Sequence, residues 1–374
     1  MRIGFDAKRA FTNNTGLGNY SRDTIRILSN LYRECKFFAY TPIKTKNRRL
    51  EFIENQKNIF IRSPKNLIGN LLKSYWRSKS IVRDLFNNKI DIYHGLSHEI
   101  PLGIEKTNIK SVVTIHDLIY IRYPKLFSSI DRKIYDKKFR SSCARSNKII
   151  AISKQTKRDI IDFFKIPEKK IHVIYQGCNK IFQKEISKKR KKEIKDKYQL
   201  FENYLLYVGS IEERKNLLTL LKSLNNLPEY NLIIIGDGKS YMKKCQKYIK
   251  TNNLQKRTKF LSGLEIEEMA GIYQQAKILI YPSIFEGFGI PIIEALFSKI
   301  PVITTKQGCF KEAGGPASIY IDPLSEDEIT SAINLIENDN KLRKYIIEEG
   351  FKYVKKFSDE KIARNIMDLY TSLS

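Results

Sequence analysis

The sequence lacks the features that mark several protein classes. Its five cysteines are scattered, with neither disulfide pairing nor metal-ligand spacing, which fits a reducing cytoplasm. Only four histidines occur, and none is grouped with cysteine at ligand spacing, so no structural zinc site is expected. No apolar run approaches the length of a membrane span, and the start of the chain carries no signal-peptide apolar region. These absences predict a cytoplasmic protein without a membrane span.

Acidic residues are outnumbered, because 68 lysines and arginines stand against 40 aspartates and glutamates, for a net charge of +28. An anionic partner such as nucleic acid, acidic lipid or a phosphorylated substrate would explain this excess. The composition of an AT-rich genome, with abundant Lys, Asn and Ile, would explain it equally. No nucleic-acid-binding motif occurs, so a nucleic-acid partner is not expected.

The apolar content is sufficient for two folded cores. Of the 374 residues, 42% are hydrophobic and 11% aromatic, which argues against disorder, and the length exceeds that of one ordinary domain. Apolar strand-like runs alternate with helical segments in both halves, which predicts an α/β protein with two doubly wound parallel sheets. A highly charged segment at 184–197 separates them as a linker or exposed helix. We therefore expect two Rossmann-like domains, over residues 1–180 and 181–357, and a last helix at 358–374.

The segment 281–294 combines the end of an apolar strand, a Gly-rich turn and the start of a helix. Backbone N–H groups of such a turn, here those of Phe288 and Gly289, favour phosphate oxygens at a helix N-terminus. Glu286 lies in the turn, and Glu294 lies about one turn into the helix that follows, so both can face one cleft. Carboxylates accept hydrogen bonds from vicinal hydroxyls. The combination predicts a sugar-nucleotide site, and the alternative is an ordinary strand, turn and helix with surface glutamates.

Two further loops carry signals for a diphosphate. Gly16 and Gly18 follow the first predicted strand, as in weak phosphate-binding patterns, although a turn that needs positive φ is the alternative. Arg214 and Lys215 stand at the start of a predicted helix, where cations are unfavourable unless an anion lies between them and the helix dipole. The missing third glycine of the dinucleotide fingerprint disfavours hydride chemistry.

The turn Glu-Gly-Phe-Gly, with a second glutamate eight residues after Glu286, resembles the two-glutamate motif of retaining glycosyltransferases with the GT-B fold. It is most similar to the group 1 family, also called glycosyltransferase family 4. The resemblance continues through nearly the whole chain, in the Gly-Leu-Gly-Asn-Tyr loop at 16–20 and the His-Asp-Leu segment that begins at His116. It implies a GT-B fold, with two Rossmann-like domains facing a cleft and a C-terminal helix that crosses back to the first domain.

The resemblance also implies a role for each candidate residue. His116 matches the histidine that orients the donor sugar, and Glu286 the carboxylate that holds sugar hydroxyls near the anomeric carbon. The remaining residues match donor-binding positions: Gly16, Gly18, Arg214, Lys215, Leu264, Phe288, Gly289 and Glu294. Among them, Glu294 would hold the ribose and Leu264 would lie near the base. Many members carry arginine directly after the strand glycine, where this chain has Ser210, so Arg214 is taken as its substitute. No metal or other cofactor is required.

These residues predict a retaining glycosyltransferase that uses a nucleotide-sugar donor. The first loop and the His-Asp-Leu segment most resemble a mannosyltransferase-like branch that builds bacterial surface polysaccharides. GDP-mannose is the first candidate donor, and a growing polysaccharide or a lipid-linked saccharide is the expected acceptor. A non-catalytic anion-binding protein and a sugar-nucleotide isomerase or phosphorylase on the same fold remain alternatives.

The segment 65–83 leaves its role open. Leu72, Tyr75 and Trp76 belong to one apolar face at helical spacing, and basic residues such as Arg77 and Lys79 lie elsewhere. Such a helix suits the anionic inner surface of a membrane, with the tryptophan at the headgroups. It also suits an ordinary helix packed on the first sheet, which we favour.

Overall fold

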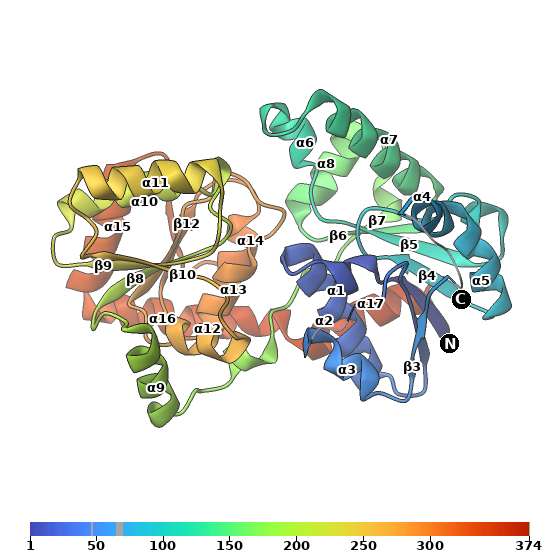
Figure 1. Cartoon of the computed structure of the whole chain (residues 1–374), viewed down its shortest axis with the longest axis horizontal. Coiled ribbons are helices and arrows are strands. Elements are labelled where there is room, and N and C mark those ends of the chain that lie inside the picture. Colours follow the sequence, from blue (N-terminus) through green and yellow to red (C-terminus); the bar gives the residue numbers. More distant parts are fainter. Residues whose placement is uncertain (46–47, 65–69, 374) are drawn as a thin grey trace. The chain divides into compact units, whose positions relative to one another are not determined.

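The computed structural model describes residues 1–45, 48–64 and 70–373. The chain divides into two compact units, each built on one parallel sheet (Figure 1). Unit 1 comprises Met1–Gly177 together with Ser358–Ser374, and unit 2 comprises Cys178–Phe357. The predicted fold of two Rossmann-like sheets is therefore confirmed.

Unit 1 contains a seven-stranded sheet in the order β3-β2-β1-β4-β5-β6-β7. β1 lies between β2 and β4, and Ile3 is in register with Phe37 on one side and Ile92 on the other. The carboxyl ends of β1 and β4 thus form the switch point at which open α/β sheets bind ligands. The strands are β1 (Arg2–Asp6), β2 (Lys36–Tyr40), β3 (Ile59–Arg62), β4 (Ile92–Gly95), β5 (Lys110–Ile115), β6 (Lys148–Ala151) and β7 (Ile171–Val173).

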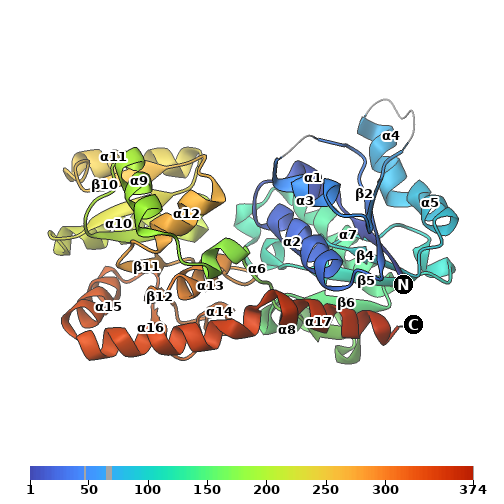
Figure 2. The ribbon, with the colours of Figure 1, turned by 90° about the horizontal axis from the view of Figure 1, so that it is seen from below.

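The helices of unit 1 include the last one of the chain. α17 packs against α2, where Asp359 forms an ion pair with Arg26 at 2.9 Å (Figure 2). The prediction that the C-terminal helix returns to the first domain is confirmed. The helices are α1 (Lys8–Thr12), α2 (Gly16–Leu31), α3 (Glu51–Glu54), α4 (Asn70–Tyr75), α5 (Ile81–Asn87), α6 (Ile119–Arg122), α7 (Ser129–Arg145), α8 (Lys154–Phe164) and α17 (Asp359–Thr371).

Unit 2 repeats the same order on six strands, β10-β9-β8-β11-β12-β13. Its switch point therefore lies between β8 and β11. The strands are β8 (Tyr204–Val208), β9 (Asn231–Ile235), β10 (Thr258–Leu261), β11 (Ile278–Tyr281), β12 (Val302–Thr305) and β13 (Ile319–Ile321). The helices are α9 (Lys188–Tyr198), α10 (Leu217–Ser223), α11 (Ser240–Thr251), α12 (Ile266–Tyr273), α13 (Ile290–Phe297), α14 (Phe310–Gly314), α15 (Glu326–Asn338) and α16 (Asn340–Val354).

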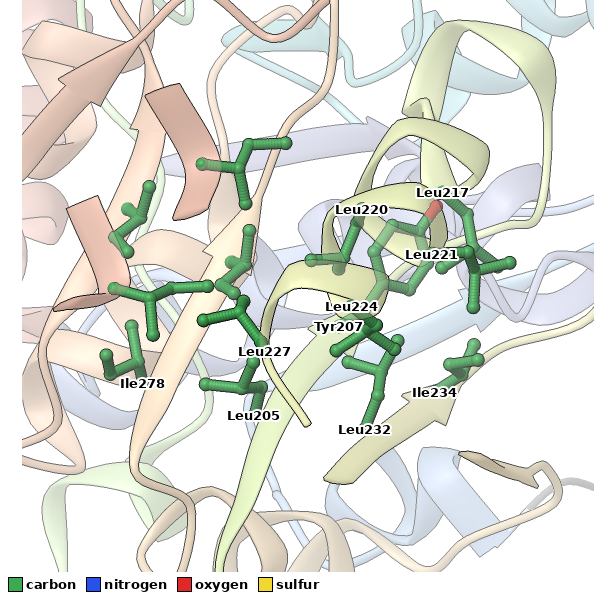
Figure 3. Close-up of a cluster of buried hydrophobic side chains, with 14 of the residues drawn as sticks. Leu205, Tyr207, Leu217, Leu220, Leu221, Leu224, Leu227, Leu232, Ile234 and Ile278 are labelled. Atoms are coloured by element: carbon green, nitrogen blue, oxygen red, sulfur yellow. The ribbon is translucent and has the colours of Figure 1, made fainter. Parts of the chain in front are cut away.

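A leucine-rich core fixes the first βαβ segment of unit 2 (Figure 3). Leu217, Leu220, Leu221 and Leu224 recur at helical spacing and are fully buried. They pack on apolar side chains of β8 and β9, because the i, i+3, i+4 and i+7 positions of a helix share one face. This packing sets where the loop between β8 and α10 leaves the sheet.

The segment after β3 corrects one prediction. Trp76 begins a π-helical turn, η2 (Trp76–Ser80), and is only 5% exposed. Its indole N–H donates to Asp84 at 2.7 Å, and its ring belongs to the apolar core of unit 1. The hypothesis that Trp76 lies at membrane headgroups is wrong, because the ring is buried within the protein. The favoured alternative, a helix packed on the first sheet, is confirmed from Asn70 onward, while the predicted helical residues 65–69 lie outside the described ones.

The charged segment before β8 forms α9, whose side chains are mostly exposed apart from the buried Ile194. This agrees with the predicted exposed helix. Among the residues that the structure describes, no helix combines the length and the apolar character needed to cross a membrane.

Candidate active site

The switch point of unit 2 holds a cluster of three charged side chains, Arg214, Lys215 and Glu286, which we call the Glu286 cluster. One carboxylate oxygen, Glu286 Oε1, lies 2.7 Å from Arg214 Nη1 and 2.5 Å from Lys215 Nζ. The side chains of Lys215 and Glu286 are 9% and 13% exposed, so both charges are largely removed from water. Their loops follow β8 and β11, which are neighbours in the sheet.

Further hydrogen bonds hold the two cations in place. Lys215 Nζ donates to the phenol oxygen of Tyr281, the last residue of β11, at 2.7 Å. Arg214 Nη1 donates to the carbonyl oxygen of Phe285 at 3.1 Å. The cluster therefore ties the loop after β8 to the turn after β11. It places two cations on one buried carboxylate, and Arg214 has a second, exposed partner in Glu212 at 3.3 Å.

The local structure around the cations differs from the prediction. Arg214 and Lys215 lie in a short 3₁₀ turn, η7 (Glu213–Lys215), and α10 begins only at Leu217, after Asn216 in the left-handed region with φ 57°. The expected conflict between these cations and the helix N-terminus is relieved inside the chain, because Glu286 supplies the counter-charge. The sequence did not reveal this pairing, since the partners are more than 70 residues apart.

Burial and neighbouring charges shift the pKa values of Glu286 and Lys215 in opposite directions. Burial alone would raise the pKa of the Glu286 carboxyl, but Lys215 and Arg214 outweigh it and hold that pKa below its usual value. Burial lowers the pKa of the Lys215 ammonium, although Glu286 opposes this effect. The carboxylate stays ionised at neutral pH, so it can accept hydrogen bonds from hydroxyl groups.

Buried contacts hold the turn that carries Glu286 in place. Gly289 precedes α13 with φ 127°, a conformation that side chains rarely adopt. The buried thiol of Cys309 lies 3.1 Å from the carbonyl oxygen of Glu286 and 3.0 Å from that of Phe288. Phe288 is itself buried, edge-to-face with Phe357. The Phe288 ring therefore anchors the turn, and only its backbone is suited to meet a ligand.

Glu294 lies on α13 and is 7% exposed. Its Oε2 accepts a hydrogen bond from the Tyr273 hydroxyl at 2.8 Å. Burial and the adjacent carboxylate hold the pKa of Tyr273 well above its usual value, so the phenol remains a donor. Leu264 is half-buried in the loop between β10 and α12. Both residues belong to unit 2.

In unit 1, His116 follows β5 and is 5% exposed. Its Nε2 lies 2.9 Å from the Leu96 carbonyl oxygen, and its ring is edge-to-face with Tyr20 at 4.7 Å between centroids. Burial lowers the His116 pKa to about 4. The imidazole is therefore neutral at pH 7 and is held in one orientation.

A buried hydrogen-bond chain beside His116 was not predicted. The Tyr20 hydroxyl lies 2.9 Å from Thr114 Oγ1, which lies 2.7 Å from His94 Nε2, and His94 Nδ1 lies 2.6 Å from the Tyr370 hydroxyl. Burial lowers the His94 pKa to about 3, so the hydrogen-bond chain is uncharged at neutral pH. His94 at the end of a strand was the only signal for it in the sequence, because Tyr370 comes from α17.

The two glycines of the first loop have different roles. Neither Gly16 nor Gly18 has positive φ, so the alternative of a turn that requires it is wrong. A Cβ on Gly18 would lie 1.8 Å from the Asn13 carbonyl oxygen, whereas a Cβ on Gly16 would meet nothing within 4 Å. Gly18 is required by close packing, and Gly16 begins α2 in open space.

Both halves of the chain match known protein families. Residues 15–180 match the family described as Glycosyltransferase Family 4, and residues 187–353 match Glycosyl transferases group 1. The O-antigen chain mannosyltransferase RfbU of Salmonella typhimurium is 31% identical over 71% of this chain and 69% of that protein. This chain is a group 1 glycosyltransferase.

The group 1 glycosyltransferase is also similar to O-antigen chain mannosyltransferase B of Escherichia coli, with 25% identity over 96% of each chain. Among solved structures, Anabaena HepE in complex with UDP and glucose aligns with a TM-score of 0.77, at 16% identity over 99% of each chain. WaaG, a glycosyltransferase involved in lipopolysaccharide biosynthesis, aligns with a TM-score of 0.72, at 17% identity over 99% of this chain and 100% of that one. The GT-B fold and the transferase class predicted from the sequence are confirmed.

Proposed function

We propose that this glycosyltransferase retains the configuration of the transferred sugar and moves a hexose from a nucleotide-activated donor to a saccharide acceptor. Mannose from GDP-mannose is the first candidate, because the RfbU and O-antigen mannosyltransferase B relatives are named as mannosyltransferases. The acceptor is a growing surface polysaccharide or a lipid-linked saccharide, reached at the inner face of the membrane.

The Glu286 cluster carries this proposal. Arg214 and Lys215 are largely buried cations at a switch point, and a diphosphate leaving group gains negative charge as the sugar departs. Preorganised charges of this kind stabilise a transition state by about 3 kcal/mol each. Glu286, ionised between them, accepts hydrogen bonds from sugar hydroxyls and so places the sugar beside the departing phosphate.

The other candidates complete the donor site in this proposal. Backbone N–H groups at Gly16 and at Phe288 and Gly289 bind phosphate oxygens, Glu294 binds the ribose, and neutral His116 orients the sugar. Gly16 fits this role because the space beside it is open. No step is assigned to a metal ion or another cofactor.

The test is release of nucleoside diphosphate by the purified full chain. GDP-mannose and UDP-glucose are supplied separately, with and without a mannose-containing acceptor. We expect acceptor-dependent release of GDP and an α-linked product, and loss of both in Glu286→Gln. Glu348→Gln, an exposed position on α16, is the matched control.

The other outcomes identify the alternatives. Conversion of a nucleotide sugar into another, without release of diphosphate, would indicate an isomerase. Donor binding without turnover in the presence of any acceptor would indicate an anion-binding protein. Release of UDP but not GDP would exclude GDP-mannose while leaving the transferase intact.

A further inference from the structure

A cavity lies within unit 1, between two helical segments. It has a volume of about 360 Å³ and lies between the α4–η2 segment and α7. Asp6 at the end of β1 and Tyr93 in β4 line its inner end, and the loop 99–102 lines one side. All of its lining residues belong to unit 1, and none is among the candidate donor-site residues. π-helical turns such as η2 are frequent at functional sites.

The lining is more basic than acidic. Arg77, Lys137, Lys138 and Arg145 line the cavity with two carboxylates, Asp6 and Glu99. Arg77 is held by both carboxylates, at 2.5 Å from Asp6 Oδ2 and 3.2 Å from Glu99 Oε2. Lys138 reaches Glu99 only at 3.4 Å and is half exposed.

Lys137 supplies the uncompensated charge. It is exposed on α7 and has no ion-pair partner within the described part of the chain. Four serines line the same cavity and add hydroxyl groups beside the cations: Ser74, Ser78, Ser141 and Ser142. Cations together with hydroxyl donors are the groups that bind phosphate oxygens.

The entrance to the cavity is apolar. Leu102 and Ile134 line it and are 51% and 44% exposed. Ile130 lies one turn before Ile134 on the same face of α7 and is 70% exposed. Large apolar side chains exposed together indicate a contact surface, whereas single ones do not. Leu102, Ile130 and Ile134 form what we call the apolar rim.

From the cavity and its rim we infer that unit 1 binds the phosphate-bearing head of an amphiphilic acceptor. The phosphate lies against Lys137 and Lys138, and the hydrocarbon part contacts the apolar rim. Charge complementarity selects a phosphate over a neutral head, and the rim selects an apolar tail over a free anion. The inference rests on the proposed function in one respect, that the acceptor is lipid-linked.

Binding to the cavity can be measured directly by isothermal titration calorimetry. Trp76 is not used as a fluorescent reporter, because its ring is buried in the core and does not line the cavity. The probes are farnesyl diphosphate and inorganic pyrophosphate, each titrated into the full chain without donor. We expect farnesyl diphosphate to bind at least about tenfold more tightly than pyrophosphate, because its tail buries apolar surface on the rim.

Two double variants locate the contacts. Lys137→Gln with Lys138→Gln should weaken binding of both probes about tenfold, as loss of two charge contacts predicts. Lys125→Gln with Lys133→Gln removes the same charge from exposed residues that do not line the cavity, and binding should change less than about twofold. Equal weakening by the two pairs would overturn the inference, because attraction would then come from diffuse charge.

The rim and the source of the phosphate are tested separately. Leu102→Ser with Ile134→Ser should abolish the advantage of farnesyl diphosphate over pyrophosphate, and an unchanged ratio would contradict the rim contact. Vesicles of phosphatidylglycerol should fail to displace farnesyl diphosphate, whereas displacement would assign the cavity to bulk lipid headgroups instead. The binding assay contains no donor, so failure to bind would contradict this inference without contradicting the transferase function. Absence of diphosphate release from any donor would contradict the transferase function without contradicting the binding result.

Discussion

The two units share one strand order but arrange their charges differently at their switch points. Unit 1 combines two kinds of group beside its switch point: His94, Thr114 and Tyr370 are neutral and joined by hydrogen bonds, and Arg77 is held between the carboxylates of Asp6 and Glu99. In unit 2 the groups are charged, with Arg214 and Lys215 on one carboxylate. Topology therefore determines where a ligand binds, and the side chains determine which ligand suits the site.

The difference has an energetic basis. A buried neutral polar group costs little once it is hydrogen-bonded, whereas a buried ion needs a partner. Unit 1 meets the first condition with neutral histidines and the second with two carboxylates around Arg77, whereas unit 2 meets the second with two cations around Glu286. With two cations on one buried carboxylate, the Glu286 cluster is prepared for another anion, whereas Arg77 is already neutralised by its two carboxylates.

The largest expected effect comes from removing the charge of Glu286. Glu286→Gln should lower turnover about a thousandfold, because sugar placement and the paired cations are both disturbed. It should also destabilise unit 2 by about 3 kcal/mol, since the buried Lys215 loses its carboxylate, whereas Arg214 keeps Glu212. Steady-state kinetics and denaturant unfolding measure the two effects. Glu294→Gln should mainly weaken donor binding, and identical behaviour of the two variants would refute the assigned roles.

A smaller effect is expected from Lys215→Ala. Arg214 still neutralises Glu286 in this variant, so unit 2 should remain folded. The rate constant for transfer should fall about a hundredfold, in line with the loss of one charge stabiliser. Single-turnover kinetics measures this constant, and Lys222→Ala, at a part-exposed position of α10, serves as the control. A folded Lys215→Ala protein with normal turnover would remove the cluster from the mechanism.

Mild acid should weaken unit 1 selectively. All four histidines lie in unit 1, and burial lowers the pKa of His116 to about 4 and that of His94 to about 3. The unfolded chain binds these protons near pH 6.5 and the folded unit does not, so stability falls as the pH drops below 6.5. Between pH 6.5 and 5 each of these two residues costs about 2 kcal/mol.

Hydrogen exchange resolved by segment, at pH 7 and pH 5, measures this selectivity. The lowered pKa of the Glu286 carboxyl places its own loss of stability below its ordinary value of 4.5, outside this window. Unit 2 should therefore keep its protection at pH 5. Equal loss of protection in both units would show that the histidines do not govern the response.

The smallest effect is expected from Tyr370→Phe. This change removes the hydroxyl bonded to His94 and should cost unit 1 about 1 kcal/mol. Tyr345→Phe, exposed on α16, should cost nothing measurable. Thermal unfolding followed by segment-resolved exchange measures both. If Tyr370→Phe lowered the protection of unit 2 as much as that of unit 1, the hydroxyl would not act through the hydrogen-bond chain of unit 1.

Local patterns predicted most of the fold, because buried parallel strands such as β9 and β11 are nearly continuous apolar runs. Pairings between distant residues were not predictable in this way. The contact of Glu286 with Arg214 joins two loops, and that of His94 with Tyr370 spans 276 positions. Trp76 shows a related limit, since helical spacing identifies an apolar face but not the surface that covers it.

The division of the chain has a consequence for biosynthesis. Residues 178–357 form unit 2 as one continuous segment, whereas unit 1 is completed only by α17. During translation, unit 2 can fold as soon as its own residues have left the ribosome. Unit 1, although it is synthesised first, waits with the α2 surface uncovered until α17 arrives. A nascent chain paused before residue 358 therefore holds a finished second unit and an unfinished first one, and this is the stage at which chaperones would be needed most.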